Sequence, residues 1–233
     1  MNMIQRYARN KKGRDFAIGD IHGCFSRLQA FLDDAGFDSS ADRLFSVGDL
    51  VDRGAGSRLA LDWLAKPWFH AVRGNHEDTA IRYAHGVPVN IDMYSANGGD
   101  WFMALGPDQQ QRFALAFQQM PLAIEVETAR GIVGIVHADC PEPDWLRFRA
   151  LLENSAAKAL QASAQEECLW SRRRITDMDR STVEGIYAVV VGHTPLQQPT
   201  ILGNVYHIDT GGWLDEGRFT LLNLEMLSID AFA

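Results

Sequence analysis

The chain has 233 residues, of which 46% are hydrophobic and 22% are charged. These values are typical of a globular protein with a sizeable core, and they argue against disorder. The formal net charge of −8 at pH 7 argues against a general nucleic-acid binder, because such proteins neutralise phosphates with Lys and Arg. We expect one domain over residues 1–233, since no repeat, low-complexity tract or linker interrupts the sequence.

Cysteine usage and hydropathy indicate the cellular setting. Cys24, Cys140 and Cys168 form no CxxC pair, so we expect free, partly buried thiols. The basic N-terminus lacks the apolar run of a signal peptide, and no apolar stretch approaches the length of a membrane span. The sequence therefore predicts a soluble cytoplasmic protein without nucleic-acid or membrane partners, and it leaves the oligomeric state open.

Short apolar runs that end in a glycine or a polar residue recur in chain order. They end at Gly19-Asp20, Gly48-Asp49, Gly74-Asn75, His137 and Gly192-His193. Such β-branched runs are typical of buried strands. Helix-period patterns lie between the early runs, for example at Phe25, Leu28 and Leu32, and this alternation indicates an α/β fold.

The middle and the last third of the chain differ in pattern. Ile91 to Gln119 is helical with breaks at Gly98-Gly99 and Gly106-Pro107, and its Trp101 is interpreted as an apolar core contact. The stretch from Pro143 to Gln165 is again mostly helical. The last third is strand-rich. We expect Val205–Ile208 and Phe219–Leu224 to be antiparallel partners.

Polar side chains with metal-binding chemistry follow five of these predicted strands. They are Asp20, His22, Asp49, Asn75, His76, His137 and His193. Ligands of open α/β sheets bind outside the carboxyl ends of the strands. Mixed oxygen and imidazole donors suit Mn, Fe, Zn or Ni better than Mg or Ca alone. A carboxylate such as Asp49 can bridge two ions, and two ions about 3.5–4 Å apart would activate a hydroxide for phosphoester hydrolysis.

A structural explanation competes with this interpretation. A single His or Asp at a strand end is usually only a hydrogen-bonded structural residue. Five successive strand ends, most of them beside glycines that allow tight turns, favour a metal centre instead. His70, His85 and His207 have no such context, so we interpret them as ordinary histidines.

Several motifs resemble the phosphoprotein phosphatase family of metallophosphoesterases. The three early blocks are Gly19-Asp20-Ile21-His22-Gly23, Gly48-Asp49-Leu50-Val51-Asp52-Arg53-Gly54 and Gly74-Asn75-His76-Glu77. The later matches are His137, Gly192-His193-Thr194-Pro195, Leu169-Trp170-Ser171-Arg172 and Ile208-Asp209-Thr210-Gly211. The likeness is closest to a bacteriophage lambda phosphatase and its bacterial relatives, and it covers almost the whole chain.

The resemblance implies a ligand set for two divalent ions, with Mn²⁺ as the expected metal and Fe, Zn, Ni or Mg as alternatives. The first ion would be held by Asp20, His22 and Asp49. The second would be held by Asp49, Asn75, His137 and His193. Asp49 would then be the bridging ligand.

The resemblance also implies catalytic and phosphate-binding roles. His76 would protonate the leaving oxygen, and Asp52 would orient and support its imidazolium form. General-acid assistance of this kind is worth about 10²–10⁴-fold. Arg53 and Arg172, together with Asn75, would bind the phosphoryl oxygens, because a guanidinium offers bidentate hydrogen bonds.

Neighbouring arginines leave alternatives open. Arg172 begins the run Arg172-Arg173-Arg174, and charge runs are usually solvated, so a neighbour could replace it as the phosphate ligand. Arg73 precedes Gly74 and is explained equally well by a structural ion pair or by a supporting role at the site.

Three functions compete. The first is a protein-serine/threonine phosphatase that acts on phosphorylated proteins or peptides, with phosphotyrosine as an additional candidate substrate. The second is a dinucleoside polyphosphate hydrolase, although the symmetrical tetraphosphatase branch commonly has Ala where this chain has Asp52 before Arg53. The third is a non-catalytic phosphoprotein-binding module, which predicts loss of a ligand or of the acid, and all seven positions are intact.

The resemblance implies an α/β/β/α sandwich of two mixed sheets. The periodicity is consistent with this sandwich but does not distinguish it from a single doubly wound sheet. Residues Tyr83 to Pro121 lie away from the signature blocks. We expect this segment to determine substrate specificity.

Overall fold

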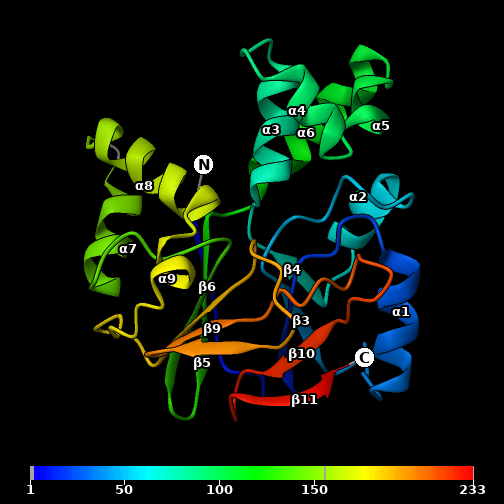
Figure 1. Ribbon diagram of the computed structural model, residues 1–233. Coiled ribbons are helices and arrows are strands. Elements are labelled where there is room, and N and C mark those ends of the chain that lie inside the picture. Colours follow the sequence, from blue (N-terminus) through cyan, green and yellow to red (C-terminus); the bar gives the residue numbers. More distant parts are fainter. Residues whose placement is uncertain (1–2, 155, 233) are drawn as a thin grey trace.

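The described residues, 3–154 and 156–232, form two packed sheets in the computed structural model (Figure 1). The first sheet has the strand order β1-β5-β6-β7-β9-β8. Its strands are β1 (Ile4–Tyr7), β5 (Ala123–Thr128), β6 (Gly131–Val136), β7 (Ala188–Val191), β8 (Thr200–Leu202) and β9 (Val205–His207). The second sheet has the order β11-β10-β2-β3-β4. Its strands are β2 (Asp15–Ile18), β3 (Arg43–Ser46), β4 (Phe69–Ala71), β10 (Thr220–Asn223) and β11 (Ser228–Phe232).

Both sheets have a parallel centre. In the second sheet β2, β3 and β4 run parallel, and in the first sheet β6, β7 and β9 do the same. Antiparallel strands complete each sheet, because β5 pairs with β6 and β10 pairs with β2. The parallel strands of each sheet therefore end at one edge, and both sheets are mixed, as the resemblance implied.

Side chains alternate between two cores along each central strand, as the period of two in a β-strand requires. Ala17 and Phe45 face the layer between the sheets, where they meet Ile135 and Val190 of the first sheet. Phe16 faces the outer side of its sheet. Burial on both faces explains why these strands are almost entirely apolar in sequence.

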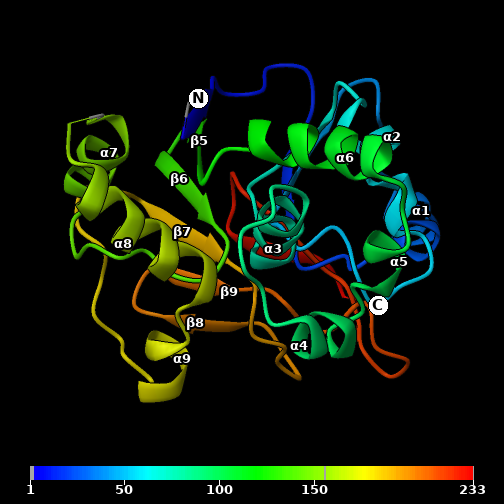
Figure 2. The ribbon, with the colours of Figure 1, turned by 90° about the horizontal axis from the view of Figure 1, so that it is seen from above.

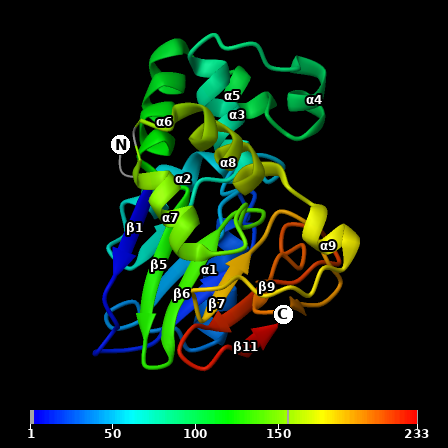
Figure 3. The same ribbon diagram turned by 90° about the vertical axis from the view of Figure 1, so that its left-hand side faces the viewer.

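Helices pack around the two sheets. They are α1 (Phe25–Asp34), α2 (Ala60–Leu64), α3 (Asn75–Ala84), α4 (Ile91–Ala96), α5 (Asp100–Met103), α6 (Pro107–Gln119), α7 (Trp145–Glu153), α8 (Lys158–Trp170) and α9 (Arg173–Asp177), with a 3-10 turn at Ser57–Leu59. α1 and α2 pack on the second sheet, and α7 and α8 pack on the first (Figure 3). The α/β/β/α sandwich is thus confirmed. None of the described helices is long and apolar enough to cross a membrane.

A group of four helices, α3 to α6, lies at one end of the sandwich (Figures 1 and 2). The predicted breaks at Gly98-Gly99 and Gly106-Pro107 separate α4, α5 and α6. Pro107 begins α6 after Gly106, because a proline at the first helical position loses no hydrogen bond.

The predicted antiparallel pairing of Val205–Ile208 with Phe219–Leu224 is wrong. β9 pairs with β7 and β8 in the first sheet, whereas β10 pairs with β2 and β11 in the second. The segment between β9 and β10 therefore crosses from one sheet to the other. Ile208 and Leu222 nevertheless share the core between the sheets, so hydrophobic patterning alone could not separate the two strands.

Candidate metal centre and active site

The five predicted strand ends converge at one edge of the sandwich. Asp20 and His22 follow β2, and Asp49 follows β3. Asn75 and His76 begin α3 directly after β4. The two late histidines follow β6 and β7. All seven predicted side chains are buried, at 6% relative exposure or less.

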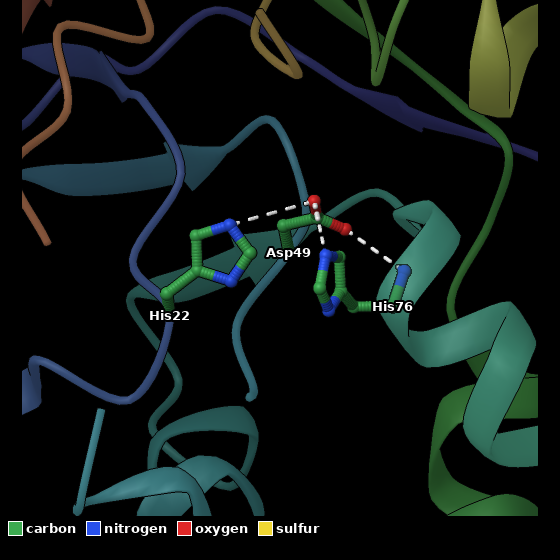
Figure 4. Close-up of side chains that lie close together, drawn as sticks. All are labelled: His22, Asp49 and His76. Carbon is green, nitrogen blue, oxygen red and sulfur yellow. Dashed lines mark hydrogen bonds and ion pairs between the residues drawn. The ribbon is translucent and has the colours of Figure 1, made fainter. Parts of the chain in front are cut away.

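Asp49 lies at the centre of this group. Its Oδ2 is 3.7 Å from Nε2 of His22 and 3.8 Å from Nε2 of His76 (Figure 4), and 3.4 Å from Nε2 of His137. These separations are long for hydrogen bonds. Two ligand atoms each about 2.1 Å from a shared ion lie at most about 4.2 Å apart, so the spacing fits ions between these atoms.

Two clusters of candidate metal ligands share Asp49. One contains His22 and His76, and the other contains His137 and His193. Within each cluster the ligand atoms lie within 4.8 Å of one another. Asp20, predicted for the first ion, is close to the first cluster, with its Oδ2 3.9 Å from Nε2 of His22. The first cluster thus includes His76, which the sequence analysis had assigned to acid catalysis.

Backbone carbonyls orient the imidazoles. Nδ1 of His22 bonds the Val51 carbonyl at 2.8 Å, and Nδ1 of His137 bonds the Val47 carbonyl at 2.7 Å. A donor at Nδ1 places the lone pair of the neutral ring on Nε2, which is the usual arrangement of metal-binding histidines. Nε2 of His193 is buried and has no hydrogen-bond partner among the described residues. These observations fit a metal centre better than a purely structural cluster.

The charges of the group explain its pKa shifts. Burial alone would raise the pKa of Asp49, but the surrounding histidines, with His137 foremost, hold it well below the usual value. Burial, aided by the charges of Asp209 and Asp49, raises the pKa of Asp20 well above its usual value. Burial lowers the pKa of His193 to about 3, and His137 adds to this effect. Neutral imidazole is the metal-binding form of histidine.

Backbone strain concentrates at the same residues. Among the described non-glycine residues, seven have positive φ, and five of these belong to the site. These five are His22, Asp49, Asp52, Arg53 and His193. Left-handed conformations cost about 1–3 kcal/mol each and cluster at functional sites. Packing must therefore hold this edge of the sandwich in place.

Two glycines leave space for the carboxylates. A Cβ at Gly74 would lie 2.1 Å from Oδ1 of Asp49, and a Cβ at Gly192 would lie 2.2 Å from Oδ1 of Asp20. The carboxylate oxygens fill this space and accept hydrogen bonds from backbone amides. His76 N donates to Asp49 at 3.0 Å, and His193 N donates to Asp20 at 3.0 Å.

His76 forms a hydrogen-bonded chain that ends in Trp101. Its Nδ1 lies 2.6 Å from Oδ2 of Asp52, and Oδ1 of Asp52 accepts from Nε1 of Trp101 at 2.6 Å. Burial lowers the pKa of His76, but the charges of Asp49 and Asp52 outweigh burial and raise this pKa above its usual value. Trp101, predicted as an apolar contact only, also positions Asp52.

The arginines divide into site and structural residues. Arg53 lies over the ring of Trp213 at 3.9 Å and bonds Nε2 of His22 at 3.1 Å. Arg172 is 3.5 Å from the Thr194 hydroxyl on the exposed side of the centre. Arg174 is buried in an ion pair with Asp139, so it is structural.

Arg73 takes the structural role that the sequence analysis left open. It pairs with Asp78 at 3.7 Å and donates to the carbonyls of Gln118 and Met120. Its contacts join α3 to the end of α6.

Sequence reasoning assigned no role to two residues that shape the site. Glu77 accepts the backbone amides of Asp49, Leu50 and Gly74, which binds α3 to the loop after β3. Trp213 carries Arg53 and makes an edge contact with His22, at 5.0 Å between ring centroids. Glu77 is the third residue after Gly74, which is the position of the glutamate in a capping box, so its role at the start of the helix could have been predicted. The sequence around Trp213 contains no comparable pattern.

A groove of about 180 Å³ opens beside His76. One wall is α3, and the other is α4 with the loop before it; Trp170 at the end of α8 closes one side. Part of the segment from Tyr83 to Pro121 therefore lies next to the candidate site.

Comparison with known proteins identifies the family. Residues 16–216 match the calcineurin-like phosphoesterase family. The chain belongs to that family. Phosphoesterases of this family depend on metal ions, which agrees with the clusters around Asp49. The resemblance deduced from the signature blocks is confirmed.

Curated relatives of this phosphoesterase cover nearly its full length. It is 34% identical to serine/threonine-protein phosphatase 1 of Salmonella typhimurium over 90% of this chain and 91% of that protein. It is 32% identical to serine/threonine-protein phosphatase 2 of Escherichia coli over 90% and 92%. A solved structure of a proposed diadenosine tetraphosphatase covers 100% of this chain and 98% of that one, with a TM-score of 0.69 and 18% identity. The last likeness shows the fold alone.

Proposed function

We propose that this phosphoesterase is a protein-serine/threonine phosphatase that uses two divalent ions and the general acid His76. The observation that carries the proposal is the contact of His76 with Asp52 beside the two clusters that share Asp49. The names of the two curated relatives described above point to the same substrate class.

The proposed ligands are the predicted ones. Asp20, His22 and Asp49 hold one ion, and Asp49, Asn75, His137 and His193 hold the other. When bound, the ions supply an activated water nucleophile and neutralise charge on the phosphoryl group. We propose Mn²⁺ as the native ion because carboxylate, amide and imidazole donors are combined. Metal analysis of the purified protein distinguishes it from Fe, Zn, Ni and Mg.

His76 moves a proton in the proposed reaction. Asp52 holds its Nδ1, so Nε2 is free to deliver a proton to the leaving serine or threonine oxygen. An alkoxide is a poor leaving group, and for this reason a proton donor matters most for phosphoserine and phosphothreonine. Trp101 fixes Asp52 from the other side.

The phosphoryl group is bound by Arg53 and Arg172 with the amide of Asn75. Trp213 holds the Arg53 guanidinium from one face. Arg172 approaches over Thr194. The buried pair of Arg174 with Asp139 favours Arg172 over this neighbour as the phosphate ligand.

Hydrolysis of dinucleoside polyphosphates is the second candidate, because a relative that is 28% identical over 83% of this chain is named an asymmetrical bis(5'-nucleosyl)-tetraphosphatase. The leaving group in this reaction is a nucleotide phosphate, which departs without help from a general acid. This candidate therefore does not explain the hydrogen-bonded pair of His76 and Asp52 as well as the first one does. We expect the Mn²⁺-loaded protein to hydrolyse a phosphoserine peptide with higher kcat/KM than diadenosine tetraphosphate. The reverse order would support the second candidate. Absence of activity on both substrates and on p-nitrophenyl phosphate would contradict the assignment of this protein as a phosphoester hydrolase.

A further inference from the structure

The groove beside His76 carries an inference about which phosphoproteins are substrates, and this inference rests on the proposed function. Asn75, Thr79 and Arg82 line one wall. Their spacings of four and three residues place them on one face of α3. The Thr79 hydroxyl donates to the Asn75 carbonyl at 2.8 Å. The wall therefore runs from Asn75 at the metal centre to the guanidinium of Arg82.

Apolar side chains form the rest of the groove. Met93 and Trp170 line it and are 57% and 36% exposed. Tyr94 is buried beneath it, and its hydroxyl has no partner among the described residues. Trp170 also makes an edge contact with His193, at 6.3 Å between ring centroids. The groove is thus continuous with the centre and offers apolar surface to a ligand.

Arg82 adds a permanent positive charge to the groove. It is exposed, and it is the one Lys, Arg, Asp or Glu among the described lining residues. Its nearest acidic neighbour on α3, Asp78, is occupied by Arg73 at 3.7 Å and by the Gln165 amide at 3.2 Å. Arg82 makes no ion pair with any described residue. An acidic ligand would provide one.

Helix geometry places this cation relative to the phosphate. Arg82 follows His76 by six residues, which corresponds to about 9 Å along the helix axis. An extended peptide covers this distance in about three residues. We propose that the groove binds the segment next to the phosphorylated residue and that Arg82 selects Asp or Glu about three positions away.

A peptide series tests this proposal. Phosphothreonine peptides carry Asp, Ala or Lys three residues before or after the phosphorylated residue. Exposed ion pairs are worth up to about 1 kcal/mol, so we expect Asp on one side to raise kcat/KM about two- to fivefold over Ala. Lys at that position should lower it. Arg82→Glu should reverse the order of Asp and Lys, whereas Arg112→Glu, at an exposed arginine of α6 outside the groove, should preserve it.

The outcomes separate this inference from the proposed function. Hydrolysis of all peptides without a preference, or a preference that Arg82→Glu leaves unchanged, would overturn the groove assignment alone. Failure on every phosphopeptide with efficient cleavage of diadenosine tetraphosphate would overturn the proposed function and this inference together.

A second inference concerns Asp209, which follows β9 at the same edge as the metal ligands. β9 runs parallel to β7, so Asp209 occupies the position in its strand that His193 occupies in the neighbouring one. Its side chain is 1% exposed. Oδ1 accepts from Gly211 N at 3.0 Å, but Oδ2 has no partner among the described residues. A buried carboxylate oxygen without a donor requires compensation.

The segment of Asp209 contacts that of Asp20 directly. A Cβ at Gly19 would lie 3.0 Å from Cα of Asp209 and 2.6 Å from the Ile208 carbonyl oxygen. We infer that Asp209 contributes Oδ2 to the first metal site, beside the three residues already assigned to it. A cation there would compensate the unpaired Oδ2 of Asp209.

Calorimetric Mn²⁺ titration of the metal-free protein tests the role of Asp209. Substitutions around a metal site typically cost about 10–100-fold in affinity, so Asp209→Asn should weaken one ion by this factor and leave the other unchanged. The melting temperature in chelator should stay equal or rise, because one buried charge is removed. Asp215→Asn, in the same loop but exposed, is the control. Unchanged Mn²⁺ affinity of Asp209→Asn would overturn the inference. A loss of affinity accompanied by lower stability of the metal-free variant would also overturn it.

Discussion

His76 occupies an ambiguous position at the scale of the single residue. Its Nδ1 is held by Asp52 at 2.6 Å, while its Nε2 shares a ligand cluster with His22 and Asp49. A carboxylate behind a histidine supports either a proton donor or a metal ligand. The two roles predict different metal contents for the same variant.

We expect His76→Asn to retain two ions and to lose about 10²–10⁴-fold in kcat on phosphoserine peptides, because the leaving oxygen departs unprotonated. The loss on p-nitrophenyl phosphate should be smaller, since nitrophenolate leaves readily. Elemental analysis and both rates measure this. Loss of one ion from His76→Asn would show that His76 is a metal ligand. Unchanged turnover of phosphoserine peptides by this variant would contradict the role of His76 as the general acid.

Trp213 should matter through Arg53. The guanidinium lies 3.9 Å above the ring, and such stacking is worth about 0.5–2 kcal/mol. Trp213→Ala should therefore raise KM for phosphopeptides by about 2–30-fold with less effect on kcat. Trp213→Phe keeps an aromatic face and should stay close to wild type. Equal KM values for all three proteins would show that the stacking does not position Arg53.

These two residues also show what the sequence could predict. The metal ligands were predictable because each follows an apolar strand, and parallel strands bring their ends together. The role of Trp213 was not predictable, because its contact with Arg53 joins loops 160 residues apart in sequence. Trp101 looked apolar, and its bond to Asp52 appears only once α5 packs beside the site.

At the scale of elements, the N-terminus of α3 is joined to the loop after β3. Glu77 accepts from Gly74 N at 2.8 Å, Asp49 N at 3.0 Å and Leu50 N at 2.8 Å. One side chain thus fixes both the helix that carries His76 and the loop that carries Asp49. Burial, with the charge of Asp49, raises the pKa of Glu77 to about 7.

We expect Glu77→Ala to lower the free energy of unfolding by roughly 3 kcal/mol or more, because three buried amides lose their acceptor at about 1–3 kcal/mol each. Glu77→Gln keeps one oxygen and should lose less. Urea unfolding in chelator measures both, with exposed Glu127→Ala as the control. An alanine variant as stable as the control would show that water replaces the carboxylate.

The same scale explains the error over β9 and β10. Alternation predicted both strands and their approximate bounds, but a strand buried on both faces gives no signal for its partner. Their true neighbours, β7 and β2, lie far away in sequence. The family resemblance implied the two-sheet sandwich, but neither it nor the alternation specified the order of the strands.

At the scale of the whole molecule, acidic charge is concentrated where ions are expected. The chain carries a net charge of −8, and Asp20, Asp49 and Asp209 are each at least 98% buried at one edge. Without ions these carboxylates repel one another in a medium that screens them poorly. We therefore expect bound ions to stabilise the fold as well as to supply chemistry.

Metal removal should lower thermal stability strongly. Each ion at about 1,000 times its dissociation constant stabilises the folded state by about 4 kcal/mol, so two ions contribute about 8 kcal/mol. For a chain of this size 1 kcal/mol shifts the melting temperature by about 2–4 °C, so Mn²⁺ should raise the melting temperature by roughly 16–32 °C over the chelated protein. Scanning calorimetry over a Mn²⁺ series measures the rise. Asp49→Asn removes the shared ligand, so this variant should melt at one temperature across the series, and a wild-type melting temperature independent of Mn²⁺ would contradict a metal centre at this edge.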